Sequence, residues 1–237
     1  MIKAEGEPIL LDASVEPDAE FIARIEELAK PLDEIRNEVV AEATAAIGGE
    51  RSVCRAEVCE MGVLVTEAML DRVKDQGVQI AIQNGGGLRA SIDAGEVTMG
   101  EVLTVLPFQN TLATFQLKGA DVMSALENGA SQIEEGAGRF AQVAGLKYTI
   151  DKSQPAGQRI SDVMVLENDA FVPIDPEKVY GVVSNNYMRG GGDGYAVFET
   201  NGMNAYDFGP DLADVVAAYL GEQKSYKAYT DDRITLK

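Results

Sequence analysis

The sequence predicts an α/β fold, in which helices pack against β-sheets. Two patterns indicate it. Apolar residues recur at helical spacing in several segments, and short β-branched runs of strand length, such as residues 78–82, lie between them. Gly and Pro residues mark the turns that separate these runs. With 237 residues, the chain is long enough to bury a substantial core in one large domain or two small ones.

The N-terminal third begins with a stripe of apolar residues at helical spacing: Phe21, Ile25, Leu28, Leu32 and Ile35. Pro31 is expected to kink or divide this helix. Residues 37–47 are apolar and can form a strand. A second helical stripe comprises Met61, Leu64, Val65, Ala68 and Met69. Gly77 should end that helix before the strand at residues 78–82, which leads to Asn84.

Further along, helices and strands are expected to mix. The predicted elements are a helix at 100–106, a strand at 111–117, a helix at 120–128 and strands at 144–150, 159–166 and 178–184. The last helix has the clearest pattern, at Leu212, Val215, Val216, Tyr219 and Leu220. We therefore predict an N-terminal arm with a linker helix over residues 1–48 and one compact unit over residues 49–237.

The chain is strongly acidic. It holds 20 Lys and Arg against 39 Asp and Glu, a formal net charge of −19. This charge argues against nucleic acid and anionic membranes as partners. No apolar run is long enough to span a membrane. Residues Met1–Gly6 lack the features of a signal peptide, so we expect that a leader and an upstream domain have been removed.

Residues for catalysis are sparse. The sequence contains no histidine, and no Ser or Cys nucleophile can therefore be paired with an imidazole base. No EF-hand-like set of spaced carboxylates occurs either. The two cysteines, Cys54 and Cys59, can either form a disulfide or remain free thiols. A bridge requires the chain between them to loop, so that their Cα atoms come within about 4.4 to 6.8 Å.

The segment Gln83–Arg89, with the sequence QNGGGLR, predicts a phosphate pocket. Glycines allow the backbone to approach an anion closely, and a guanidinium such as that of Arg89 can grip it. The glycines follow a strand, and open α/β sheets place ligands at strand ends. The alternative is a tight turn whose Arg89 points into solvent.

Four segments occurring in order together resemble the C-terminal, substrate-binding domain of the 5′-nucleotidase family, which includes periplasmic UDP-sugar hydrolases and animal ecto-5′-nucleotidases. They are Cys54–Gly62 (CRAEVCEMG), Asn84–Arg89 (NGGGLR), Val105–Thr111 (VLPFQNT) and Asn185–Gly194 (NNYMRGGGDG). The resemblance implies a four-layer α/β/β/α fold. It also implies that catalysis takes place at a divalent metal pair, such as Zn or Mn, in an N-terminal metallophosphoesterase domain.

The resemblance assigns a phosphate end to the site. Arg55 and Arg89 fall on positions that grip phosphate in the family, with Asn84 as a neutral donor and Gly86 and Gly87 lining the approach. Arg51 and Arg189 receive less support from the motifs. We expect both to be surface charges, with ligand contact as the alternative.

At the opposite end, the resemblance places the nucleobase between Phe108 and Tyr187. Asn110 matches a position that reads the purine edge, and Asp193 matches a carboxylate that accepts ribose hydroxyls. Without the resemblance, Phe108 could instead be a buried core residue, and Gly190–Gly194 could be only a flexible turn. That turn lacks the Lys-Ser/Thr pair of a P-loop.

The resemblance also implies a disulfide between Cys54 and Cys59, which would hold Arg55 in place and indicate a periplasmic or secreted protein. One residue departs from the family, because Val63 stands where an asparagine is usual. We therefore expect a nucleotide-recognition domain that binds a nucleotide or related small phosphate ester, holds no cofactor itself and is inactive alone. The alternative is a non-catalytic, stand-alone ligand-binding or interaction module.

Overall fold

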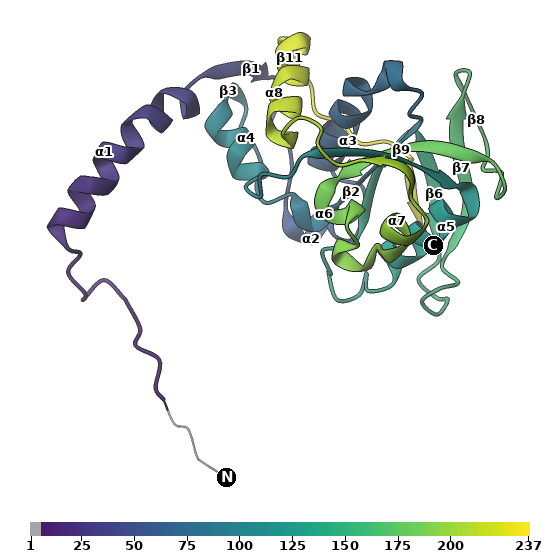
Figure 1. Ribbon diagram of the computed structural model, residues 1–237, viewed down its shortest axis with the longest axis horizontal. Helices are drawn as coiled ribbons and strands as arrows, with labels where there is room; N and C mark the ends of the chain where they lie inside the picture. Colours follow the sequence, from purple (N-terminus) through teal and green to yellow (C-terminus); the bar gives the residue numbers. More distant parts are fainter. Residues whose placement is uncertain (1–5) are drawn as a thin grey trace.

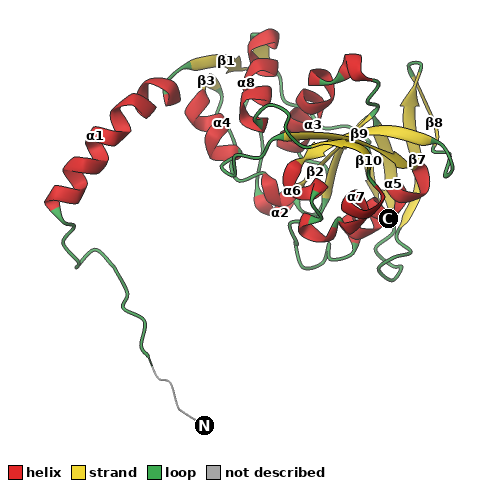
Figure 2. Ribbon diagram, viewed as in Figure 1, coloured by secondary structure: helices red, strands yellow, loops and turns green. Residues whose placement is uncertain are grey.

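The computed structural model describes residues 6–237. The prediction that Met1–Gly6 is not a signal peptide therefore falls almost wholly outside the described residues. The central sheet has five strands in the order β10-β4-β9-β2-β5. Figures 1 and 2 show two of them, β2 and β9, in the main body of the molecule. These strands are Met203–Tyr206, Leu112–Lys118, Val179–Asn185, Ile80–Asn84 and Ala141–Ala144. Strands β2 and β9 run parallel, with Ile80 opposite Val182, whereas the other pairings in this sheet are antiparallel.

Two smaller sheets complete the β-structure. One has the order β12-β6-β7-β8, formed by Ile234–Leu236, Leu146–Ile150, Ile160–Glu167 and Ala170–Pro173. The other has the order β11-β1-β3, formed by Ser225–Tyr226, Val39–Ala43 and Gly95–Thr98. Strand β1 (residues 39–43) thus pairs with two strands from later in the chain, β11 and β3. The division of the chain between residues 48 and 49 stays a prediction.

Successive side chains along the central strands point to opposite faces of the sheet, so the sheet divides the core into two parts. Ala81 and Val183 share a core with helix α3 (Glu60–Arg72), which covers one side of the central sheet, and with helix α8 (Leu212–Gln223), which packs on α3 and on β1. Ile82 and Val182 face the other side, where the four-stranded sheet and helix α5 (Gly119–Ala130) pack. Helices thus cover mixed β-sheets that also pack on each other, and the predicted α/β fold class is confirmed.

Helix α1 (Ala19–Arg36) extends away from the rest of the molecule (Figure 1). The Asp18 carboxylate accepts hydrogen bonds from the backbone N–H groups of Glu20 and Phe21 and so starts the helix. None of its residues is buried. Pro31 was predicted to kink or divide this helix. The helix runs through Pro31, so it is not divided there. The helix is exposed there, so solvent can satisfy the carbonyl that loses its donor.

The other predicted elements are present with shifted ends, and helix α4 (Met99–Val105) starts with a capping box of Thr98 and Glu101. Sequence patterns missed several short elements. They are the small strands β3, β5, β8, β10, β11 and β12 and the helices α2 (Arg51–Cys54), α6 (Asn186–Arg189) and α7 (Ala196–Asn201). Segments of this length are too short for a periodic pattern. Among residues 6–237, no helix is both long and apolar enough to cross a membrane.

Arg233 links three parts of the core, and its replacement should destabilise the fold. The guanidinium is almost fully buried and donates to the Val143 carbonyl, to Glu67 and, through two nitrogens, to Asp231. Arg233→Met removes these four hydrogen bonds and should lower the free energy of unfolding in urea by about 2 kcal/mol. Lys118→Met removes only the exposed pair with Glu177 and should cost less than about 1 kcal/mol. Equal losses would contradict this account.

Candidate functional site

The predicted site residues line one pocket of about 570 Å³. The lining residues are Arg55, Asn84, Gly86, Gly87, Arg89, Phe108, Asn110, Tyr187 and Asp193, joined by Gly138. Asn84 and Asn185 are the last residues of the parallel strands β2 and β9. The pocket therefore begins at the carboxyl ends of neighbouring parallel strands, where α/β sheets usually hold ligands.

In the part of the chain that the structure describes, Arg55 and Arg89 face this pocket without a carboxylate partner. Nη1 of Arg55 makes a long hydrogen bond of 3.4 Å to the Gly136 carbonyl, and Nη1 of Arg89 makes one of the same length to the Gly86 carbonyl. Within residues 6–237, neither arginine forms a salt bridge, and the buried Nε of Arg55 has no partner. Because a buried donor without an acceptor is costly, the pocket favours an anion.

The charges around Arg55 also favour an anion in the pocket. Burial lowers the pKa of its guanidinium, the positive charges of Arg51 and Arg89 lower it further, and Asp193 opposes them. A local excess of positive charge therefore exists in a chain whose net charge is −19. An anion between the arginines would relieve their mutual repulsion.

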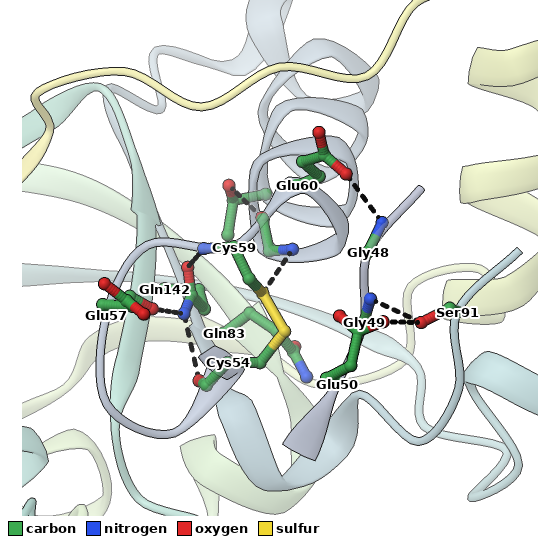
Figure 3. Close-up of a disulfide and its surroundings, with 12 residues drawn as sticks. Gly48, Gly49, Glu50, Cys54, Glu57, Cys59, Glu60, Gln83, Ser91 and Gln142 are labelled. Atoms are coloured by element: carbon green, nitrogen blue, oxygen red, sulfur yellow. Dashed lines mark hydrogen bonds between the residues drawn. A yellow bond between two sulfur atoms is a disulfide. The ribbon is translucent and has the colours of Figure 1, made fainter. Parts of the chain in front are cut away.

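Cys54 and Cys59 form a disulfide with a Cα–Cα distance of 5.1 Å (Figure 3). The predicted bridge is present. Cys54 ends α2 and Cys59 caps α3, its sulfur accepting a hydrogen bond from the Gly62 N–H. The bridge therefore joins the ends of two helices, and the loop between them, residues 55–58, carries Arg55.

This disulfide should resist reduction while the protein is folded. Cys54 is fully buried and Cys59 is 2% exposed, so a thiolate cannot reach either sulfur. Treatment with dithiothreitol and then iodoacetamide should leave the mass of the native chain unchanged, whereas the same treatment in urea should label both cysteines. Labelling at equal rates in both conditions would show that the loop opens readily.

The glycines after β2 have packing reasons of their own. A Cβ atom at Gly85 would lie 2.1 Å from the Cys54 carbonyl oxygen, and one at Gly86 would lie 2.8 Å from the Gly138 Cα. Only glycine allows the disulfide loop and the chain at Gly138 to approach this closely. The glycines thereby bring Arg55 beside the end of β2. Approach of their backbone to an anion stays a prediction.

Asp193 is held by two neighbours. One carboxylate oxygen accepts from Nδ2 of Asn84 at 2.7 Å, and the other accepts from the Tyr187 hydroxyl at 3.0 Å. Asp193 has a left-handed φ of 53°, which is uncommon for a residue with a side chain and often marks a functional position. The carboxylate lines the pocket with lone pairs still available, so it can accept hydroxyl hydrogen bonds.

The two predicted aromatic residues are half exposed. Phe108 is 54% exposed and Tyr187 is 49% exposed, and both line the pocket. The alternative of Phe108 as a core residue is therefore wrong. The ring of Tyr187 lies against Gly192, where a Cβ would come within 2.6 Å of it. The Arg89 guanidinium lies 5.8 Å from the centre of the Phe108 ring. Exposed rings beside a concave site offer stacking surfaces.

Arg51 is exposed, as expected, but Arg189 is not a surface charge. The Arg189 side chain is only 13% exposed, with Nε 3.6 Å from Asp207 and its guanidinium 5.8 Å from the Phe115 ring centre. It does not line the pocket. Val63 is fully buried in α3. Its effect on the site stays untested.

Sequence reasoning missed Gly138 and the polar residues behind the pocket. The Asn185 side chain donates to Gln83 and to Asn84, and all three side chains are buried. This network fixes the side chain of Asn84. Gln83 and Asn185 lie within the motifs named above, but buried amides give no periodic signal, so their role behind the pocket was not predicted. Within residues 6–237, no three His, Cys, Asp or Glu side chains lie together as potential metal ligands.

A family model described as the C-terminal domain of 5′-nucleotidase matches residues 39–200. The chain belongs to this family. The family binds nucleotide substrate, and its fold is the one described above. The 5′-nucleotidase precursor of Thermus thermophilus superposes with a TM-score of 0.86 at 44% identity, over 92% of this chain and 43% of that one. The NAD nucleotidase of Haemophilus influenzae gives 0.78 at 29% identity, over 93% and 41%.

Among curated 5′-nucleotidase family proteins, the trifunctional nucleotide phosphoesterase YfkN of Bacillus subtilis is 38% identical over 84% of this chain and 14% of its own length. The human 5′-nucleotidase is 30% identical over 99% and 43%. The venom 5′-nucleotidase of Naja atra is 31% identical over 93% and 44%. This 5′-nucleotidase-type chain thus spans less than half the length of these relatives.

Proposed function

We propose that this chain is the nucleotide-recognition domain of a 5′-nucleotidase-type phosphoester hydrolase. The observation that carries the proposal is the pair of arginines, Arg55 and Arg89, which face one pocket with no carboxylate partner in the described chain. A phosphate dianion matches two guanidiniums in charge, and each planar guanidinium can give paired hydrogen bonds. Asn84 can add a neutral donor.

The remaining lining residues fit a nucleoside. Phe108 and Tyr187 offer ring faces to a base, and a stacked base gains about 1 to 3 kcal/mol from an aromatic neighbour. Asn110 offers both a donor and an acceptor for the base edge. Asp193 can accept ribose hydroxyls between the phosphate and base ends. The pocket is large enough for a small ligand of this class.

The chain's part in catalysis is positioning. Arg55 and Arg89 hold the phosphoryl oxygens and the rings hold the base, so that the ester is presented in one orientation. Bond cleavage belongs to a separate metallophosphoesterase domain with a divalent metal pair, which would supply activated water. The greater length of the relatives supports such a partner domain. The disulfide and the venom relative support a periplasmic or secreted location.

Calorimetric titration of the chain with AMP, adenosine and inorganic phosphate tests the proposal, with phosphate release assayed in parallel in added Mn²⁺ or Zn²⁺. We expect AMP to bind more tightly than adenosine or phosphate, without release. Release of phosphate would contradict the assignment of catalysis to another domain. A folded chain that binds none of the three ligands would instead favour the stand-alone interaction module.

A further inference from the structure

The Gln142 side chain spans both ends of the disulfide loop (Figure 3). Its Nε2 donates to the carbonyl of Cys54 at 3.0 Å and to that of Glu57 at 2.7 Å, and its Oε1 accepts from the N–H of Cys59 at 3.3 Å. A single primary amide therefore uses both donors and its acceptor on the backbone that surrounds Arg55. All three contacts join residues more than 80 positions apart.

The surroundings of Gln142 leave its amide little freedom. The residue is 1% exposed and lies in β5, with Gln83 of β2 as its cross-strand partner. On the other side, a Cβ at Gly62 would lie 2.3 Å from its Oε1. The start of α3 therefore packs directly on the amide. The hydrogen bonds of this buried amide therefore hold the loop in a fixed position relative to the central sheet.

Arg55 depends on this loop for its orientation. Within residues 6–237, its guanidinium makes one hydrogen bond, the 3.4 Å contact with the Gly136 carbonyl, and no salt bridge. No side chain therefore fixes the guanidinium directly. Its direction follows from the backbone at residue 55, which lies between the two carbonyls that Gln142 holds. The disulfide joins the loop ends, whereas Gln142 fixes the loop relative to β2 and the pocket.

We propose that Gln142 is the positioning residue for Arg55, and that its amide orients the guanidinium toward the phosphate group of a bound nucleotide. The inference rests on the proposed function. Gln142 touches no ligand itself, since it does not line the pocket. Its loss should therefore weaken phosphate recognition and leave recognition of the nucleoside in place.

The test uses Gln142→Met, which removes the hydrogen bonds at similar side-chain length, and Gln142→Glu, which keeps an acceptor but loses both donors. Tyr148→Phe is the matched control. It also removes a buried side-chain donor from a backbone carbonyl of β5, that of Ala141, but leaves the loop untouched. Calorimetry should show AMP binding weakened roughly tenfold or more in both Gln142 variants, with adenosine binding unchanged. Tyr148→Phe should bind both ligands like the parent chain.

A second readout needs no ligand. In the free protein, NMR relaxation of the Arg55 backbone N–H and Nε–H groups should show greater mobility in Gln142→Met than in the parent chain or Tyr148→Phe. An unchanged Arg55 signal would overturn the proposal, as would equal losses for AMP and adenosine, which indicate a general structural role. If the parent chain binds no AMP while Arg55 still loosens in Gln142→Met, the proposed function fails but the positioning role stands.

Discussion

Replacing Arg89 with alanine is expected to weaken AMP binding by roughly 10 to 150-fold, because a charge-assisted hydrogen-bonding group contributes about 1.5 to 3 kcal/mol. Adenosine should bind almost as before, since it carries no phosphate. Arg89 lies on the loop after the glycines and forms no salt bridge in the described chain, so its removal leaves no buried carboxylate without a partner. The comparison of the two ligands by calorimetry therefore isolates the phosphate contact.

Arg51→Ala is the matched control for this experiment. Arg51 is exposed on α2, close enough to lower the pKa of Arg55, but it does not line the pocket. The substitution changes the net charge by the same amount and should weaken AMP binding only slightly, and less at higher salt. If Arg51→Ala and Arg89→Ala weaken AMP equally, general electrostatic attraction explains binding and the specific phosphate contact is wrong.

Phe108→Ala should weaken AMP and adenosine by the same factor, roughly 5 to 150-fold, because a stacked base contributes about 1 to 3 kcal/mol. The ring is 54% exposed and lines the pocket, so its loss should scarcely change the free energy of unfolding. Inorganic phosphate should bind as in the parent chain. Calorimetry with the three ligands and a urea titration measure both quantities.

Phe171→Ala provides the control, because Phe171 is also partly exposed but lies in β8, away from the pocket. It should leave binding of all three ligands unchanged. If Phe108→Ala binds adenosine as tightly as the parent chain, then its ring does not stack on the base. The base would then have to be held by Tyr187 and Asn110 alone.

Much of the fold followed from local patterns. The stripe from Leu212 to Leu220 predicted α8 because its apolar face packs on α3 and on β1, and that burial imposes the helical period. Gly77 was predicted to end α3 but does not, because α3 already ends at Arg72; Gly77 instead ends a short 3₁₀ turn at Lys74–Gln76, with a left-handed φ of 71°. Strand order could not be predicted in this way, since the parallel pairing of β2 and β9 joins residues about 100 positions apart.

The pocket was predictable only where chemistry is concentrated in motifs. Some site residues belong to short, unusual runs, and the family resemblance assigned them roles. They are Gly85–Gly87, Arg89 and Asp193. Gln142 and Gly138 stand in ordinary sequence, and their importance arises from contacts across the fold. The prediction that Arg189 is a surface charge was wrong. The motifs gave Arg189 little support, so it was expected on the surface, but tertiary packing against Phe115 and Asp207 shields its side chain.

The central claim is that a single pocket binds the phosphate and the base of one nucleotide, and a crystal structure of the chain with AMP tests it most directly. The account predicts phosphate oxygens within hydrogen-bonding distance of Arg55 and Arg89, the base against Phe108 and Tyr187, and a ribose hydroxyl on Asp193. AMP bound elsewhere, or bound here with its phosphate away from both arginines, would contradict it.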